Sequence, residues 1–209
     1  MHSYLQPKQN IHTEFVEKKS RFITDLAIVH STDEALQHIK EIKNRYPDAR
    51  HHCTAFRIHT PFQERYNDDG EPQGTAGPPI LSVLSREELF NICVVVTRYF
   101  GGILLGASGL TRAYTRGAAD AVSLAEKECV RAAVLLKMRF SYAYHDFLFH
   151  FLRNFIYTEK SKNFTHEVEL ELWVPAEDAQ ALRVGIREGS ANNINVVEME
   201  RKLMPFRTE

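Results

Sequence analysis

Two glycine-rich segments hold the residues best suited to chemistry in this chain. Seven of its ten glycines fall between Gly70 and Gly109, in one segment over residues 67–79 and a second over residues 97–110. Glycine at this density permits positive φ and lets other groups approach the backbone closely. Each segment also leads into an expected helix start, where backbone amides without partners favour anions. With arginines nearby, the two segments predict a site the size of a phosphate group.

The candidate residues for anion or nucleic-acid binding come from these segments and their surroundings. Arg112 and Arg116 are four residues apart and share a face if a helix forms there. Tyr99, Phe100 and Tyr114 have aromatic rings of the kind that stack on bases. The full candidate set is Arg21, His52, Asp69, Glu71, Gly74, Thr75, Gly77, Arg98, Tyr99, Gly101, Gly102, Ser108, Gly109, Arg112, Tyr114 and Arg116.

A structural interpretation of the same residues stays open. The glycines would then only make tight turns between packed elements. The aromatic rings would belong to the core, and the arginines would pair with Asp68, Asp69 or Glu71. Which interpretation holds depends on whether the two segments meet in the folded chain.

Catalytic chemistry has weaker support. Gly101 to Ser108 has the glycine spacing of a phosphate-binding loop, but Ala107 stands where its lysine should be, which disfavours nucleotide hydrolysis. The three acidic residues of the first segment could hold Mg²⁺ or Ca²⁺, although they do not match the calcium-loop pattern and a solvated turn explains them equally well.

A histidine–cysteine run offers a further possibility. His51, His52 and Cys53 are consecutive, so on a strand His52 faces away from its two neighbours and the three cannot bind one metal ion. His51 and Cys53 could pair as base and nucleophile, but the third group and the oxyanion site are not evident. We therefore expect no catalytic residue, no metal and no cofactor, and a binding protein rather than an enzyme.

The first half of the chain predicts alternating strands and helices. The expected strands cover residues 22–29, 51–59 and 91–100. The first helix begins with a capping box from Ser31 to Glu34 and stops at Pro47. A second helix opens at Pro78-Pro79, because proline has no amide to leave unpaired there, and a third covers residues 110–124 with Ser108 as its cap.

The second half of the chain has a different pattern of strands and helices. Strict alternation over 165–174, with Val168, Leu170, Leu172 and Val174 on one face and three glutamates and Trp173 on the other, predicts a strand. The other expected strands are 130–144, 157–162 and 194–199, and the helices are 146–156 and 177–188, the latter closed by Gly189. This βαββαβ order is that of a ferredoxin-like domain. We predict an α+β chain with a βαβ module over 1–128 and a ferredoxin-like domain over 129–209.

Composition limits the possible partners and surroundings. The net charge of −1 gives no overall field to attract nucleic acid, so such binding would need a local patch. The three cysteines have no metal-binding spacing and are expected to be reduced thiols. The first twelve residues lack an apolar signal core, and no run reaches the ~18 apolar residues of a membrane helix. We expect a cytoplasmic protein with no membrane contact.

The same motifs carry a family resemblance. His51 to Phe56, Asp68 to Gly77 and Val94 to Tyr114, preceded by Ser20-Arg21-Phe22, resemble the YigZ/YvyE/IMPACT family in the same order. With the C-terminal half, the resemblance covers nearly the whole chain. Two small departures, at residues 107–109 and 115–116, concern the shape of one loop.

The resemblance implies a fold and a function. The N-terminal half would share the fold of a ribosomal-protein domain and of domain IV of elongation factor G, and the C-terminal half would resemble domain V of that factor. Eukaryotic members regulate translation by competing for a large activator of a stress-responsive kinase. The function implied is a non-catalytic, translation-linked regulator that binds RNA or the ribosome. The alternatives are a protein–protein regulator that docks on the same loops or, less favoured, a metal-dependent phosphate-ester or small-molecule enzyme. The sequence does not determine the oligomeric state.

Overall fold

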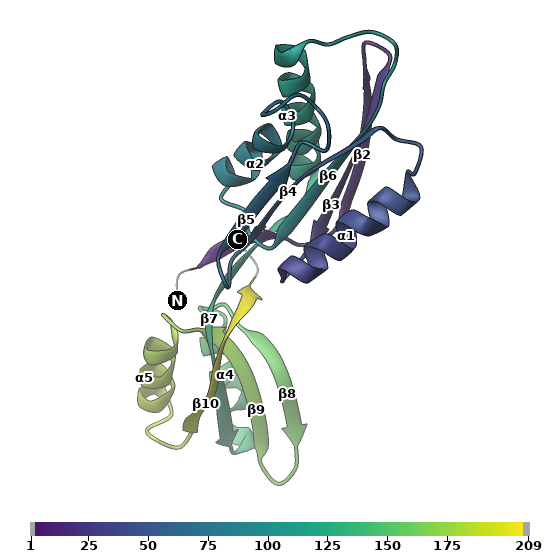
Figure 1. Cartoon of the computed structure of the whole chain (residues 1–209). Helices are drawn as coiled ribbons and strands as arrows, with labels where there is room; N and C mark the ends of the chain where they lie inside the picture. Colours follow the sequence, from purple (N-terminus) through teal and green to yellow (C-terminus); the bar gives the residue numbers. More distant parts are fainter. Residues whose placement is uncertain (1–2, 207–209) are drawn as a thin grey trace. The chain divides into compact units, whose positions relative to one another are not determined.

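The computed structural model describes residues 3–206 of the chain, which fold into two compact units (Figure 1). Tyr4–Glu128 form one unit, and the other begins at Cys129. Residues 1–2 and 207–209, at the ends of the two predicted domains, lie outside the described part. Both units combine helices with an antiparallel sheet, which confirms the predicted α+β class. Across residues 3–206, no helix combines the length and the apolar character that a membrane span requires.

The first unit is built on a five-stranded antiparallel sheet. Its strand order is β2-β3-β6-β4-β5, and the short strand β1 precedes it in the chain. The strands are β1 (Tyr4–Pro7), β2 (Ile11–Glu17), β3 (Ser20–Ile28), β4 (His51–Ile58), β5 (Gln63–Asn67) and β6 (Ile92–Tyr99). The predicted strands correspond to β3, β4 and β6, the three inner strands. Strands β1, β2 and β5 were not predicted; β2 and β5 are edge strands whose polar, half-exposed residues are held by pairing to a neighbour.

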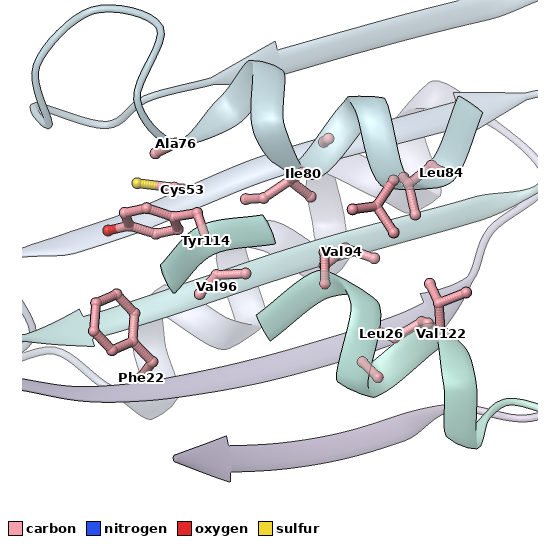
Figure 2. Packing of buried hydrophobic residues seen from close by; sticks show 14 of the residues in the cluster. Phe22, Leu26, Cys53, Ala76, Ile80, Leu84, Val94, Val96, Tyr114 and Val122 are labelled. Carbon is pink, nitrogen blue, oxygen red and sulfur yellow. The ribbon is translucent and has the colours of Figure 1, made fainter. Parts of the chain in front are cut away.

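Helices cover both faces of this sheet. Helix α1 (Thr32–Arg45) packs on one face, and α2 (Gly77–Arg86) and α3 (Ala107–Leu124) lie together on the other (Figure 1). Residues alternate between two cores along each inner strand, so that in β6 Val94 and Val96 face α2 and α3 whereas Cys93 and Val95 face α1. Figure 2 shows the larger core, in which Tyr114 of α3 lies next to Cys53 of β4.

The helix starts confirm one predicted cap and correct another. The Ser31 hydroxyl accepts from the Glu34 amide at 3.2 Å, as the predicted capping box requires, and the Glu34 carboxylate accepts from the amide of His30, one residue before the cap, at 2.8 Å. Ser108 does not cap α3. The cap is Gly106, at φ 73°, a conformation that glycine adopts without a Cβ penalty, and Ser108 lies inside the first turn.

The second unit has the predicted βαββαβ order. Its elements are β7 (Lys127–Phe140), the 3-10 turn η1 (Tyr142–Tyr144), α4 (His145–Leu152), β8 (Thr158–Phe164), β9 (Val168–Pro175), α5 (Ala179–Gly189) and β10 (Asn195–Phe206). The strands pair antiparallel in the order β10-β7-β9-β8. The alternating residues Val168, Leu170, Leu172 and Val174 are all fully buried, on the one face where the pattern placed them. Strand β10 is longer than expected because it stays paired with β7 as far as Phe206.

Candidate functional site

The two glycine-rich segments meet at one cavity of about 330 Å³ in the first unit. The first segment contributes Glu71 and Pro72. The second contributes Phe100, Leu104, Leu105, Gly106, Ala107 and Leu110. Arg50 and His51 at the start of β4, and Arg98 near the end of β6, complete the lining. We call this the glycine-loop cavity.

A buried polar cluster lies at this cavity. Glu71 accepts from the Arg98 guanidinium at 2.6 Å and from the Tyr114 hydroxyl at 2.8 Å. The side chains of Arg98 and Glu71 are only 6% and 4% exposed. A second Arg98 nitrogen donates to the Ser20 hydroxyl at 3.3 Å. Because Glu71 neutralises Arg98 away from solvent, this guanidinium serves the fold rather than offering a free cation.

Tyr114 is part of the core, not a stacking platform. It is fully buried, and burial raises the pKa of its phenol far above the usual range, with the neighbouring Cys53 and Glu71 acting in the same direction. The core interpretation of this ring is therefore the one that the structure supports. Its hydroxyl positions Glu71 beneath the cavity.

The start of α2 is closed by a carboxylate of the chain itself. Asp68 Oδ1 accepts from the amides of Ala76 and Gly77 at 3.0 and 2.8 Å, and Oδ2 accepts from the Gly74 amide at 2.9 Å. The expectation of free amides here is wrong, because Asp68 already satisfies them. Thr75 is buried and donates its hydroxyl hydrogen to the Pro72 carbonyl at 2.7 Å, so this whole turn is structural.

Asp69 and His52 lie away from the glycine-loop cavity. Asp69 binds Lys43 of α1 at 2.8 Å and accepts from the His52 amide at 2.7 Å. Burial alone would raise the pKa of Asp69, but these two hydrogen bonds hold it below its usual value. The His52 ring contacts the Tyr46 carbonyl at 3.1 Å, and burial lowers its pKa. His52 is therefore a packed residue on the α1 face of the sheet.

Arg21 and Tyr99 lie on the face of the sheet that α1 covers, opposite to the face of α2 and α3. They are direct partners in the β3–β6 register, and both alternate with residues that face α2 and α3. Arg21 is hydrogen-bonded to Glu14 at 2.5 Å, and its guanidinium carbon lies 6.0 Å from the centre of the Tyr99 ring. These two predicted site residues form a separate surface group.

The start of α3 differs from that of α2. No side chain caps it, and the amides of Ala107, Ser108 and Gly109 have no acceptor within residues 3–206. The loop before α3 requires glycine at position 101, because a Cβ there would overlap the carbonyl group of Lys19. The Gly101 amide donates to the Ser20 hydroxyl at 3.2 Å, and Gly102 follows at φ 85°. The second segment thus brings an uncapped helix start to the cavity, where Gly106 and Ala107 line the wall.

Arg112 and Arg116 share a face of α3, as predicted. Both line a second hollow of about 230 Å³ beside Lys18 and Glu17. Arg116 pairs with Asp120 at 3.4 Å and covers the Phe15 ring at 4.3 Å. Arg112, like Arg50, is exposed and has no carboxylate partner in the described part of the chain. Leu105 lines both this hollow and the glycine-loop cavity.

Catalytic and metal chemistry find little support in this geometry. Asp68, Asp69 and Glu71 bind separate partners, and no group of three His, Cys, Asp or Glu side chains within residues 3–206 is placed to hold a metal ion. Burial raises the pKa of the Cys53 thiol to about 12, so it is protonated at neutral pH. Its sulfur contacts the Asp68 carbonyl at 3.0 Å.

Comparison with known proteins places the chain in a family. Residues 18–122 match the model of the Impact N-terminal domain. The IMPACT family member YvyE of Bacillus subtilis is 34% identical, over 96% of this chain and 93% of that protein. An IMPACT family member of Haemophilus influenzae is 36% identical, over 96% and 98%. The chain belongs to the IMPACT family.

A solved structure has a similar fold along nearly the whole chain. The crystal structure of an hypothetical protein is 30% identical, with a TM-score of 0.62, and the match covers 96% of this chain and 98% of the other. The matched Impact N-terminal domain includes every residue that lines the glycine-loop cavity. The cavity therefore lies within the part of the chain that defines the IMPACT family.

Sequence reasoning missed some of the cavity's residues. Arg50, His51, Leu104 and Leu105 line it but were not in the candidate set. A signal for His51 was present, since strand alternation already placed it on the same face as Cys53. No local signal marked Arg50 or the two leucines, because their place in the cavity depends on how the loop before α3 packs in the tertiary structure.

Proposed function

We propose that this IMPACT-family protein is a non-catalytic, translation-linked regulator that binds RNA or the ribosome. The binding surface consists of the glycine-loop cavity and the adjoining hollow along α3. One observation carries the proposal: both glycine-rich segments line a single cavity whose rim has an exposed, unpaired Arg50 and whose α3 amides lack a cap. A phosphate group is the natural partner of such a rim.

The walls of the cavity suit a base that is not stacked in a helix. Pro72, Phe100 and Leu110 supply apolar contact area, and Phe100 is 44% exposed, so its ring is available for stacking. Proteins recognise single-stranded RNA by stacking unpaired bases on aromatic side chains while cations follow the phosphates. Arg50 on one side and Arg112 on the other would follow the strand across this surface.

The state of the acidic residues supports a non-catalytic role. Glu71 is occupied by Arg98 and Tyr114, Asp68 by three backbone amides, and Asp69 by Lys43. A general base needs a free oxygen within hydrogen-bond reach of the proton that it takes, and these carboxylates are committed to holding the loop. The three acidic residues of this loop therefore stabilise the conformation of the binding surface.

RNA binding is tested by the affinity for a short single-stranded oligoribonucleotide across a salt series. Arg50→Gln and Arg112→Gln should each weaken binding, and each should reduce the slope of log K against log salt by about 0.7, the contribution of one phosphate contact on a single strand. Arg86→Gln is the matched control, because Arg86 is exposed at the far end of α2 and lines neither cavity. Binding that ignores salt, or that falls equally in the control, contradicts the proposal.

Ribosome binding is tested by co-sedimentation with the same variants. The wild-type chain should sediment with ribosomes, and the double variant Arg50→Gln/Arg112→Gln should stay in the supernatant while Arg86→Gln sediments normally. Co-sedimentation that persists in the double variant would show that another surface makes the contact.

Exposed apolar residues favour a second candidate function, docking of a protein on the same loops. Leu104 is 82% exposed and Ile103 is 42% exposed, and both follow the glycines of the second segment. Apolar side chains presented together on a loop are typical of protein contacts. A protein partner would be retained after nuclease treatment and lost in Leu104→Ser, whereas RNA binding would depend mainly on Arg50 and Arg112.

A further inference from the structure

The second unit has a cavity of its own, of about 420 Å³, between α5 and β10. Five polar side chains line it: Gln180, Arg183, Arg187, Asn192 and Asn195. Val184 and Val196 supply an aliphatic part of the wall. The volume lies within the range of small-molecule sites.

Helix α5 contributes two guanidinium groups to the lining of this cavity. Arg183 and Arg187 are four residues apart, so they share a face of the helix, while Leu182 and Ile186 bury its other face in the core. The turn after α5 is held by Ser190, whose hydroxyl accepts from the Ile194 amide at 3.2 Å. In that turn Asn192 has a φ of 65°, a conformation that asparagine tolerates better than most residues, and its side chain lines the cavity.

The positive charge of the cavity is compensated only in part. None of its lining residues is acidic. Arg187 is exposed and has no carboxylate partner within residues 3–206. Arg183 is 3.9 Å from Glu198, at the limit of an ion pair, and Glu198 is held more closely by Arg201 at 2.5 Å. The hollow is therefore lined by one unpaired guanidinium, that of Arg187, and by a second, that of Arg183, whose carboxylate partner is shared with Arg201.

We propose that this cavity binds a phosphate ester of nucleotide size. The two guanidinium groups suit the phosphate oxygens, since a planar guanidinium donates two parallel hydrogen bonds to such a group. The amides of Gln180, Asn192 and Asn195 can donate to and accept from hydroxyl or base groups, and the valines contact the ring. This site is in the second unit and does not depend on the function proposed for the first.

The test uses the full-length chain, labelled with ¹⁵N, and adenosine monophosphate as the probe. Amide signals of α5 and of residues 190–196 should shift on titration. Arg183→Gln and Arg187→Gln should each weaken binding about tenfold, the effect of losing one charge-assisted hydrogen bond. Arg153→Gln is the matched control, because Arg153 is exposed in the same unit and does not line the cavity. Because two single variants are measured, the proposal can still be tested if one of them folds poorly.

Two sources of the phosphate ester are distinguished by further titrations. A free nucleotide or a 5′-phosphorylated end predicts that a 5′-phosphorylated oligoribonucleotide binds and its 5′-hydroxyl form does not. Binding of both forms assigns the site to internal phosphates of a chain. Either outcome supports phosphate-ester recognition. The same titrations with the Arg50→Gln/Arg112→Gln variant, in which binding at the first unit is weakened, report binding at the second unit separately.

Three results would overturn the inference. One is the absence of shifts at α5 with millimolar adenosine monophosphate. Another is equal binding of adenosine, which has no phosphate. The third is unchanged affinity in both arginine variants.

Discussion

At the scale of single residues, Glu71 shows how an acidic side chain in a glycine-rich loop can serve the fold. It is buried with Arg98 and Tyr114, and the three come from the first glycine segment, β6 and α3. A buried guanidinium is tolerated only while its counter-charge is present. Removing Glu71 therefore acts on stability before it acts on binding.

Glu71→Gln should lower the free energy of unfolding by about 3 kcal/mol or more, because it leaves the Arg98 charge buried and unpaired. Urea denaturation of the purified variant measures this loss. Glu14→Gln is the control, since it breaks an exposed pair with Arg21 and should have a much smaller effect. Equal losses in the two variants would show that the Glu71 pair has no special role.

His52 makes stability depend on pH. Burial disfavours the charged imidazolium, so the pKa of His52 in the folded chain lies below the ordinary value of about 6.5. The unfolded chain takes up the proton first as the pH falls. The free energy of unfolding should therefore decline below about pH 6.5 and be unaffected by this group above it.

The measurement compares unfolding of wild type and His52→Gln at about pH 7.5 and pH 5.5. The variant should lose less stability on acidification. The remaining loss includes His38, whose pKa burial also lowers. An identical loss in the two proteins would be incompatible with a buried neutral His52.

At the scale of elements, the two helices that border the candidate surface begin in different ways. Asp68 closes the start of α2 through three amides, whereas α3 starts at Gly106 with no side-chain cap. Both starts follow glycine-rich segments of similar appearance. Only the second lacks a side-chain cap, and for this reason we assign the phosphate contact of the proposed function to α3.

Asp68→Ala should destabilise the first unit by about 2 kcal/mol, the upper range for loss of a helix cap, since three amides lose their acceptor. Chemical denaturation gives the value. Asp68→Asn keeps one acceptor oxygen and should show a smaller loss. If alanine and asparagine behave alike, the cap does not stabilise this turn.

At the scale of the whole molecule, each unit has its own core. The clusters around Tyr114 and around Ile42 draw only on the first unit, and those around Leu172 and around Trp173 draw only on the second. Units with separate cores can lose stability separately. The proposed surface of the first unit and the phosphate-ester cavity of the second are thus supported by different cores.

Hydrogen exchange tests this independence. In Glu71→Gln, amide protection should fall across β3, β4 and β6, and it should stay at the wild-type level in β7, β9 and β10. Mass spectrometry of the exchanged, digested protein resolves the two sets of strands. A uniform fall in protection over both would mean that the chain unfolds as one cooperative unit.

Much of the fold followed from local pattern. The inner strands β3, β4 and β6 were predicted from their runs of apolar and β-branched residues, which fit strands buried on both faces. The start of α1 was predicted from its capping residues, and β9 from the alternation of its side chains. The edge strands β2 and β5 were not predicted, because most of their residues are polar and none is fully buried, and their conformation comes from pairing with a neighbour.

The sequence by itself determined the family, the order of the main elements and the two segments that line the cavity. Only the tertiary structure decided which of the candidate residues are free. Glu71 binds Arg98 across 27 positions and Tyr114 across 43, and Arg98 reaches Ser20 across 78. Such contacts depend on how distant strands and helices pack, and on which face of a strand a residue occupies, so no local pattern records whether a charged side chain is available to a ligand or already neutralised.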